Sequence, residues 1–362
     1  MSRRDGEPLR AGLVIGQLTT GGAEGQLRLL CQGLDHAAIR PVVYCLSERT
    51  EPYGKLLEQS GTPVRVIGGS RATRVLGLRR ALTADGIQVV HAWLFIANAY
   101  AWVARLGERW PLITSARNCK RQGRWLDALN VRAFGASTAI IVNSARVRDY
   151  IAREYAAPAQ RITVIPNAID LTRFRPRPRP AGAKCVAMVG RLVTQKNPLL
   201  FVEAAAALRA RLPDVRFMLI GDGPLRSTVE AAVRAAGLDG CCTLTGERDD
   251  VHELLGSADL FWLTSEWEGL PNGVIEALAC GLPVVATDVG GTAELLRDGE
   301  QGFLIAPGDR AALVDRSARI LADPALHARM RAAARARAEA FGVDEMVRAT
   351  SAVYAAADRG TS

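Results

Sequence analysis

Residues 264–294 have the sequence TSEWEGLPNGVIEALACGLPVVATDVGGTAE. A loop rich in Gly and Pro leads into an expected helix over residues 272–280, which has Asn as its N-cap and a glycine just past its end. The apolar run 283–287 predicts a buried strand, and Gly290 and Gly291 predict a turn that opens another helix. This order of elements is typical of an α/β fold.

The same alternation continues on both sides of this stretch. Short apolar runs predict further strands at 11–18, 41–46, 63–68, 87–92, 111–116, 139–144, 162–166, 184–190, 215–221, 242–246 and 259–264. Helical patterns lie between or after them, at 23–34, 198–212, 325–341 and 343–356. Continuous apolar strands separated by helices indicate parallel sheets covered on both faces. Two successive doubly wound halves predict a ligand cleft between them, at the carboxyl ends of the strands.

A proline-rich segment divides the two halves. In FRPRPRPAG, residues 174–182, prolines alternate with arginines, so neither a helix nor a central strand is expected there. The domains predicted are therefore 1–173, a Pro/Arg linker over 174–183, a second domain over 184–342, and a C-terminal helix and tail over 343–362 that packs back on the first domain.

Composition fits two soluble globular domains with different partners. The 362 residues are 49% hydrophobic and 23% charged, and the net charge is +9. Residues 1–183 hold 27 Lys/Arg and 13 Asp/Glu, whereas residues 184–362 hold 19 and 24. Two interpretations of the basic half stay open: drift in an Arg-rich proteome, or contact with an anionic acceptor or membrane surface, where each basic residue contributes on the order of 1 kcal/mol.

Cysteine usage and hydropathy indicate a cytoplasmic protein. The seven cysteines include no C-x-x-C pair, which predicts neither a disulfide framework nor a zinc site. The start, MSRRDGEPLR, is charged but lacks a following apolar stretch, so no signal peptide is expected. The most apolar stretch, residues 89–104, is short for a bilayer and carries His91 and Asn98, which favours a buried strand followed by a buried helix.

Two carboxylates give residues 264–294 their chemical character. Glu268 and Glu276 lie eight positions apart across the loop-to-helix junction. One can accept both hydroxyls of a ribose while the other reaches a second sugar, and bare N–H groups at Gly290 and Gly291 can bind a diphosphate. The pattern predicts a sugar-nucleotide pocket; the alternative is a pair of solvated surface glutamates.

The spacing Glu268-x7-Glu276 resembles the E-x7-E signature of retaining glycosyltransferases of family 4, which have the GT-B fold. The resemblance extends over most of the chain, through QLTTGGAE (17–24), VIPNAID (164–170), GRLVTQKN (190–197), LIGDGPL (219–225) and DVGGTAEL (288–295). It implies two Rossmann-like domains that face a central cleft, with the acceptor bound by the first and a nucleotide-diphosphate sugar by the second. It also implies front-face displacement, without a cofactor or a metal ion.

The resemblance assigns roles to individual residues. Glu276 matches the glutamate that holds the donor ribose, and Glu268 the one that contacts the donor sugar. Arg191 and Lys196 match the basic pair that neutralises the donor diphosphate, although two exposed loop cations are the alternative. The expected donor-binding residues are completed by Gly21, Gly22, Gly221, Gly223, Gly269, Leu270, Asn272, Gly290, Gly291 and Thr292.

His91 is open to two interpretations. The family often has H-x-H here and sometimes a further histidine, but this chain has Trp93 and Ile96 at those places. His91 is therefore either a catalytic residue that contacts the transferring sugar or a core histidine satisfied by a neighbour. Further polar residues at strand ends are candidates for contact with donor or acceptor, namely Ser115, Arg117, Asn118, Asn143 and Ser144. A basic cluster of Arg117, Lys120, Arg121 and Arg124 could meet an acceptor diphosphate or lipid head groups, or be a solvated loop.

Absent motifs narrow the function further. There is no D-x-D, no Walker A lysine motif and no Cys/His cluster with metal spacing, and GDGPLR has Arg226 where a dinucleotide motif needs its third glycine. The sequence thus predicts transfer of a hexose or hexosamine, with UDP and then GDP as the expected nucleotides. The expected acceptor is a lipid-linked glycan of cell-surface polysaccharide synthesis, with peripheral contact to the inner, anionic membrane face and no nucleic acid. A sugar-nucleotide 2-epimerase and a non-catalytic sugar-nucleotide-binding relative are the alternatives.

Overall fold

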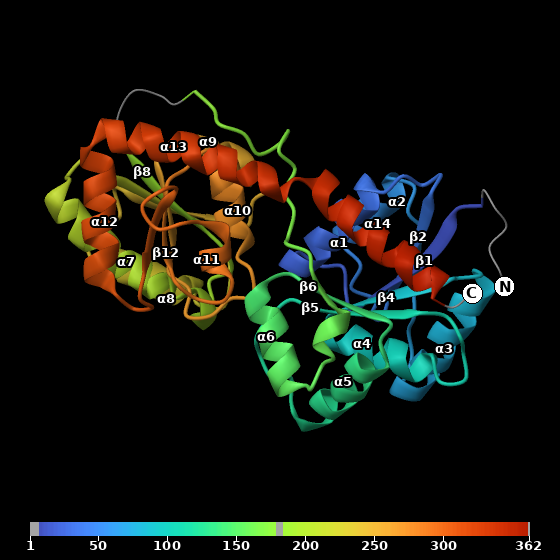
Figure 1. The fold of residues 1–362 in the computed structure, drawn as a ribbon. Helices are drawn as coiled ribbons and strands as arrows, with labels where there is room; N and C mark the ends of the chain where they lie inside the picture. Colours follow the sequence, from blue (N-terminus) through green and yellow to red (C-terminus); the bar gives the residue numbers. More distant parts are fainter. Residues whose placement is uncertain (1–6, 179–183, 361–362) are drawn as a thin grey trace. The chain divides into compact units, whose positions relative to one another are not determined.

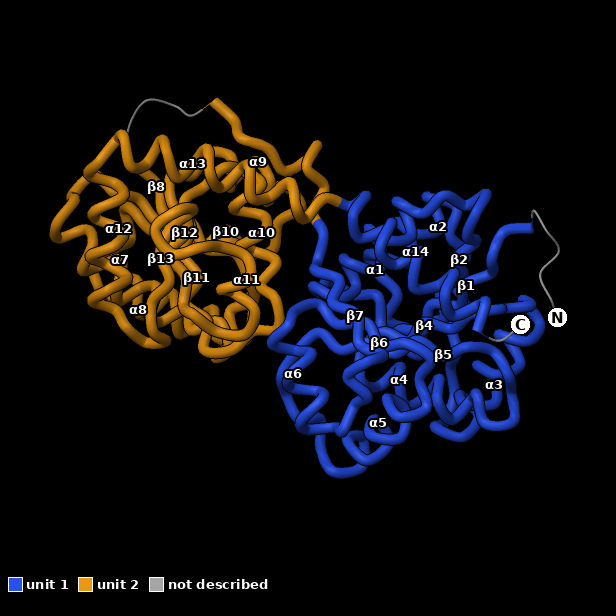
Figure 2. Tube along the Cα trace, viewed as in Figure 1, with its two compact units in different colours: residues 1–168, 343–362 blue, residues 169–342 orange. Residues whose placement is uncertain are grey.

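The computed structural model describes residues 7–178 and 184–360, which form two compact units (Figure 2). Unit 1 comprises residues 1–168 and 343–362, and unit 2 comprises residues 169–342. Each unit is a parallel β-sheet with helices on both faces, as the sequence predicts.

Unit 1 holds a sheet with the strand order β3-β2-β1-β4-β5-β6-β7, in which every described pairing is parallel. The strand order reverses beside β1, which makes the sheet doubly wound. Its strands are β1 (Leu9–Ile15), β2 (Ile39–Cys45), β3 (Val64–Val66), β4 (Val89–Trp93), β5 (Leu112–Ala116), β6 (Ala139–Val142) and β7 (Ile162–Val164). Its helices are α1 (Gly22–Gly33), α2 (Tyr53–Gln59), α3 (Arg71–Ala84), α4 (Leu94–Ala104), α5 (Arg124–Ala136), α6 (Ala145–Glu154), the 3-10 turn η1 (Ala159–Arg161) and α14 (Val343–Arg359).

Unit 2 repeats this plan with the order β10-β9-β8-β11-β12-β13, again parallel throughout the described pairings. Its strands are β8 (Cys185–Val189), β9 (Arg216–Ile220), β10 (Cys242–Gly246), β11 (Leu260–Leu263), β12 (Val284–Thr287) and β13 (Gly302–Ile305). Its helices are α7 (Pro198–Arg211), α8 (Arg226–Ala235), α9 (Val251–Gly256), α10 (Asn272–Ala279), α11 (Thr292–Leu295), α12 (Arg310–Ala322), α13 (Pro324–Ala338) and the 3-10 turns η2 (Thr194–Lys196) and η3 (Glu339–Phe341).

The strands are apolar on both faces because each face is covered. In β11, Leu260 and Trp262 pack into the core under α7 and α12, whereas Phe261 and Leu263 pack into the opposite core under α10 and α13. All four side chains are buried, and each contributes roughly 1.5–3 kcal/mol by leaving water. This two-sided burial explains why the sequence shows unbroken apolar runs rather than alternation.

Helix α14 completes the core of unit 1. It packs beside α1, and Figure 1 shows the two ends of the colour scale, red α14 and blue α1, side by side. Met346 and Tyr354 of α14 lie in one core cluster with Leu27 and Leu30 of α1. Gly33 makes the close packing possible, because a Cβ there would lie 2.7 Å from a methyl carbon of Val347.

Three details differ from the expectation. The boundary between the units falls between residues 168 and 169, before the expected linker, and Pro176 and Arg177 pack on glycines of unit 2; residues 179–183 of that linker lie outside the described residues. Strand β13 was not predicted. Helix α10 has Pro271 rather than Asn272 as its N-cap, so Asn272 is its first residue.

The stretch 89–104 folds as predicted, into β4 followed directly by α4. Within the described part of the chain, no helix is both long and apolar enough to cross a membrane.

Candidate active site

Glu268 lies at the centre of a buried polar group in unit 2. Lys196 Nζ donates to Glu268 Oε1 at 2.5 Å, and Ser265 Oγ donates to the same oxygen at 2.7 Å. Gln195 Nε2 lies 3.5 Å from the other carboxylate oxygen, Oε2. Glu268 is 7% exposed and the Lys196 side chain 19% exposed, so this ion pair is largely withdrawn from water. The solvated-glutamate alternative is therefore wrong for Glu268.

The ends of three neighbouring strands hold this group together. Thr264, directly after β11, donates from Oγ1 to the Lys196 carbonyl at 2.8 Å, which fixes the turn η2 that follows β8. Thr287, at the end of β12, donates from Oγ1 to the Ser265 carbonyl at 2.7 Å. Asn197 then caps α7 by accepting from the Leu200 N–H. The pair thus lies at the carboxyl edge of the sheet, where α/β folds bind ligands.

Glu276 lies in the second turn of α10 and carries an unused acceptor. The residue is half-buried, and its Oε2 is closed off from solvent without a hydrogen-bond partner among the described residues. Burial raises the pKa of Glu276 to about 7, while the positive charges of Lys196 and Arg173 act in the opposite direction. A buried carboxylate oxygen without a donor is suited to receive a hydroxyl group.

Arg191 differs from Lys196 because its side chain has no hydrogen-bond or ion-pair partner among the described residues. Its side chain is exposed, two residues after the end of β8, and makes no ion pair or side-chain hydrogen bond with any residue that the structure describes. The two cations predicted as a pair therefore have different surroundings. Lys196 is ion-paired with Glu268, whereas Arg191 has no ion-pair partner among the described residues.

The glycine turn after β12 is built by close approach to the Glu268 loop. Gly290 has φ +57°, and a Cβ there would lie 2.3 Å from the Glu268 carbonyl oxygen. The N–H of Gly291 donates to the Gly269 carbonyl at 2.7 Å, and the Thr292 N–H bonds to a carbonyl of the turn. The expectation that Gly291 offers a bare N–H to a diphosphate is therefore wrong, because the fold already uses that donor.

Gly221 and Gly223 bring the loop after β9 against the loop after β8. A Cβ at Gly221 would lie 2.2 Å from the Gly190 carbonyl oxygen, and one at Gly223 would lie 2.6 Å from the Leu192 carbonyl oxygen. Both glycines thus allow a tight backbone contact. Leu270 is buried in the loop that leads into α10, between the two glutamates.

In unit 1, the glycine pair at the start of α1 faces a carboxylate. Gly21 is the N-cap of α1 and Gly22 its first residue. A Cβ at Gly21 would lie 2.2 Å from Oε2 of the buried Glu24. An acidic side chain therefore already occupies this helix terminus, where negative charge is favoured.

His91 is buried in β4 on the sheet face covered by α1 and α14. Its Nδ1 lies 2.8 Å from the Tyr354 hydroxyl, and its Nε2 has no partner among the described residues. Burial lowers the pKa of His91 to about 3, with a smaller contribution from the Arg117 charge, so the ring is neutral at ordinary pH. The interpretation of His91 as a satisfied core histidine therefore holds for Nδ1, which has a partner, but not for Nε2, which has none among the described residues.

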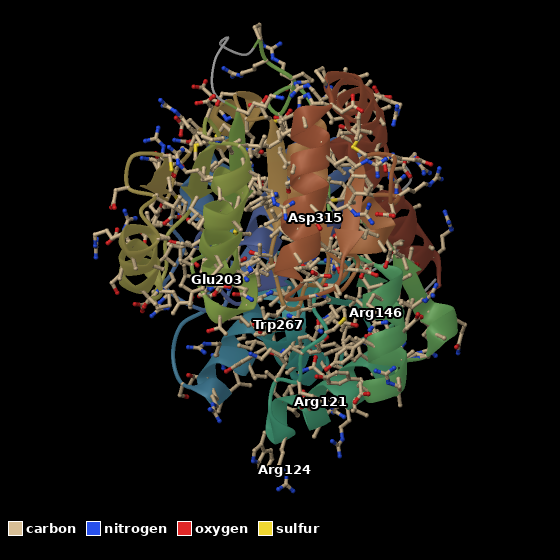
Figure 3. The ribbon with its side chains drawn as sticks, turned by 90° about the vertical axis from the view of Figure 1, so that its left-hand side faces the viewer. Arg121, Arg124, Arg146, Glu203, Trp267 and Asp315 are labelled. Carbon is tan, nitrogen blue, oxygen red and sulfur yellow. The ribbon has the colours of Figure 1, made fainter. Side chains whose placement is uncertain are left out.

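The four residues of the expected basic cluster have different environments in the structure. Arg117 stacks over Trp93, whereas Arg121 pairs with Glu154 at 3.0 Å and lies over Tyr155. Lys120 and Arg124 remain as exposed cations, and Figure 3 shows Arg124 extending outward from the start of α5.

The serines among the polar strand-end candidates serve the fold. Ser115 donates to the Ala92 carbonyl at 3.0 Å, and Ser144 caps α6 by accepting from the Val147 N–H. Asn143 differs, because its Oδ1 is buried and unpaired within the described residues.

Sequence reasoning missed Ser265, Gln195 and Tyr354. Ser265 and Gln195 stand beside residues that were singled out, three positions from Glu268 and one from Lys196. Tyr354 carried no signal, because its contact with His91 spans most of the chain.

Comparison with known proteins decides the family. The family model described as "Glycosyl transferases group 1" matches residues 172–337, and the model described as "Glycosyltransferase Family 4" matches residues 20–173. The 2-deoxystreptamine glucosyltransferase of Streptomyces kanamyceticus is 30% identical over 75% of this chain and 77% of its own. The chain belongs to glycosyltransferase family 4. It is therefore a glycosyltransferase.

A further relative of this family 4 enzyme and one set of solved structures are informative. The Escherichia coli UDP-Gal:alpha-D-GlcNAc-diphosphoundecaprenol alpha-1,3-galactosyltransferase is 30% identical over 59% of this chain, and the match spans somewhat over half of that relative, 58%. Crystal structures of Anabaena HepE, solved with UDP or with UDP-glucose, align with a TM-score of 0.85 at 21–22% identity over 96% of this chain and 100% of theirs. They confirm the expected GT-B fold.

Proposed function

We propose that this family 4 glycosyltransferase moves a hexose or hexosamine from a nucleoside-diphosphate sugar to a hydroxyl group, with retention of the anomeric configuration. The observation that carries the proposal is the unpaired, buried oxygen of Glu276 within the field of Lys196. A ribose presents two neighbouring hydroxyls, and both can donate to one carboxylate. Glu276 then binds the ribose in its ionised form.

The donor diphosphate is assigned to the cations after β8. Arg191 is exposed and unpaired among the described residues, so an anionic ligand neutralises it without breaking an existing ion pair. Fixed cations stabilise negative charge that develops on a leaving diphosphate. Glu268, held by Lys196 and Ser265, is positioned to accept from hydroxyls of the transferred sugar. UDP is the first nucleotide to test, because the HepE structures contain it, and GDP is the next.

The proposed reaction is a front-face displacement. The bond between the anomeric carbon and the diphosphate oxygen breaks, and a bond from the acceptor oxygen forms on the same face. The proton of the acceptor hydroxyl goes to the departing diphosphate, so no protein nucleophile is required. Arg191 and Lys196 stabilise the leaving group, and neither a metal ion nor a cofactor enters the proposed step.

A lipid-linked glycan is the proposed acceptor. The E. coli relative carries diphosphoundecaprenol in its name, and residues 1–183 are strongly basic. Trp125, at the start of α5, is 87% exposed and follows the exposed Arg124. An exposed Trp beside cations is suited to the interface of an anionic membrane.

Flotation with anionic and with neutral liposomes tests the membrane contact. We expect the protein to bind anionic vesicles. Binding should fall in Trp125→Ala but not in Trp267→Ala, since Trp267 is also exposed but belongs to unit 2. Failure to bind either kind of vesicle contradicts the membrane contact.

The donor site is tested by calorimetry and thermal shift with UDP, GDP, ADP and their common sugars. We expect one nucleotide to bind selectively to the wild type and not to Glu276→Ala, while Glu203→Ala, an exposed change on α7, binds normally. No response to any nucleotide contradicts the proposal. If the protein converts the donor sugar to its 2-epimer without an acceptor, the epimerase alternative is correct and the proposed transfer is wrong.

A further inference from the structure

Arg117 is a half-buried cation that has no ion-pair partner among the described residues. Its Nη1 donates to Asn167 Oδ1 at 2.7 Å, and its guanidinium carbon lies 4.2 Å from the centre of the Trp93 ring. No carboxylate pairs with it among the described residues, and its Nε is buried without a hydrogen-bond partner. Burial lowers the pKa of Arg117 to about 10, and the through-space influences of Tyr354 and Glu24 act against this. A buried charge is costly unless an opposite charge or sufficient hydrogen bonds compensate it.

Two further unpaired nitrogens adjoin this cation. Trp93 and His91 are each 1% exposed, and neither Trp93 Nε1 nor His91 Nε2 has a partner among the described residues. Their ring centres are 5.0 Å apart, and Arg117 covers the Trp93 ring. A buried donor that lacks an acceptor is unfavourable, so three in adjoining side chains indicate a site that a ligand completes.

The three nitrogens have one hydrogen-bonding character. Arg117 Nε and Trp93 Nε1 can only donate. His91 Nε2 also donates when Nδ1 accepts from the Tyr354 hydroxyl, 2.8 Å away, and an acceptor ligand selects that tautomer. Trp93 is the last residue of β4 and Arg117 directly follows the neighbouring strand β5, whereas His91 lies two residues before the end of β4.

We propose that Arg117, Trp93 and His91 form an oxyanion site in unit 1 that binds a phosphate group. A phosphate offers several acceptor oxygens and the negative charge that Arg117 lacks. The proposal rests on the proposed function, because the phosphate belongs either to the acceptor or to the donor diphosphate. Glu24 is the acidic side chain whose charge acts on Arg117.

The test uses the indole N–H signals of the six tryptophans in ¹⁵N NMR spectra of the full-length protein, with Trp93→Phe to identify the Trp93 signal. We expect millimolar inorganic phosphate to move the Trp93 signal saturably and to leave the Trp125 signal in place. The movement is lost in Arg117→Met, persists in Arg124→Met and is weakened in Arg117→Lys. The other five indole signals show whether each variant is folded.

A second titration, with UDP, distinguishes the two sources of the phosphate. If UDP moves the Trp93 signal in the wild type but not in Glu276→Ala, the site takes the donor diphosphate. If inorganic phosphate alone moves it, the site takes an acceptor phosphate. No movement with either ligand, or equal movement in Arg117→Met, overturns the proposal. If UDP binds in a way that depends on Glu276 but does not move the Trp93 signal, the proposed function is supported and the oxyanion site is wrong.

Discussion

Replacing Lys196 with methionine leaves Glu268 charged and buried without its cation. Removing one partner of a fully buried ion pair costs about 3–5 kcal/mol. Lys196 is 19% exposed, and Glu268 keeps its hydrogen bond from Ser265, so the cost here is lower. We expect Lys196→Met to lower the free energy of unfolding by about 2–3 kcal/mol. In a unit of this size that corresponds to a fall in Tm of roughly 4–12 °C.

A double-mutant cycle measured by thermal and urea unfolding tests this value. Glu268→Gln removes the charge that Lys196 compensates, so the double variant should recover at least about 1 kcal/mol relative to the sum of the single changes. Arg211→Met is the control, because its pair with Asp315, labelled in Figure 3, is more than half exposed on both sides and should contribute no more than about 0.5 kcal/mol. The reasoning is refuted if Lys196→Met costs no more than Arg211→Met, or if the changes in the cycle are additive.

Two further predictions concern the same loops. Because burial raises the pKa of Glu276 to about 7 and ribose binding needs the ionised form, UDP affinity should weaken by up to about tenfold per pH unit below pH 7. Calorimetry should show this extra loss in the wild type and not in Glu276→Gln, and equal pH profiles would contradict it. Gly290→Ala should destabilise by about 2 kcal/mol or more, since φ is +57° and the new Cβ meets a carbonyl at 2.3 Å. Gly299→Ala, with φ +82° and open space, should cost about 1 kcal/mol, and equal melting temperatures would contradict the steric argument.

The strands, and the edge of the sheet at which the site lies, could be predicted because each depends on a short stretch of sequence. Each expected strand overlaps an observed one, since burial on both faces leaves an unbroken apolar run. Strand β13, with the four residues GFLI, was not predicted. Residues directly after strands necessarily meet at one edge of a parallel sheet. For that reason Lys196 and Glu268 could be expected near each other without any knowledge of side-chain contacts.

Contacts between distant segments could not be predicted. The N–H of Gly291 looks bare in the sequence, and only the fold places the Gly269 carbonyl 2.7 Å away. Arg117 looks like one member of an exposed basic run, but the pairing of β4 with β5 brings it over Trp93. A side chain's exposure depends on which strand lies next to its own, and that order is not written in any short stretch of sequence.

Helix α14 has a consequence for how the protein is made. Unit 2 is one continuous stretch, residues 169–342, whereas unit 1 needs residues 1–168 together with α14, which the ribosome produces after unit 2. Synthesis proceeds at about 5–20 residues per second, so the sheet of unit 1 waits without Met346 and Tyr354 for roughly ten seconds or more. Its apolar face under α14 is exposed to chaperones during that interval. The order of folding on the ribosome is therefore the reverse of the order in the chain: unit 2 can close first, and unit 1 closes when α14 has been made.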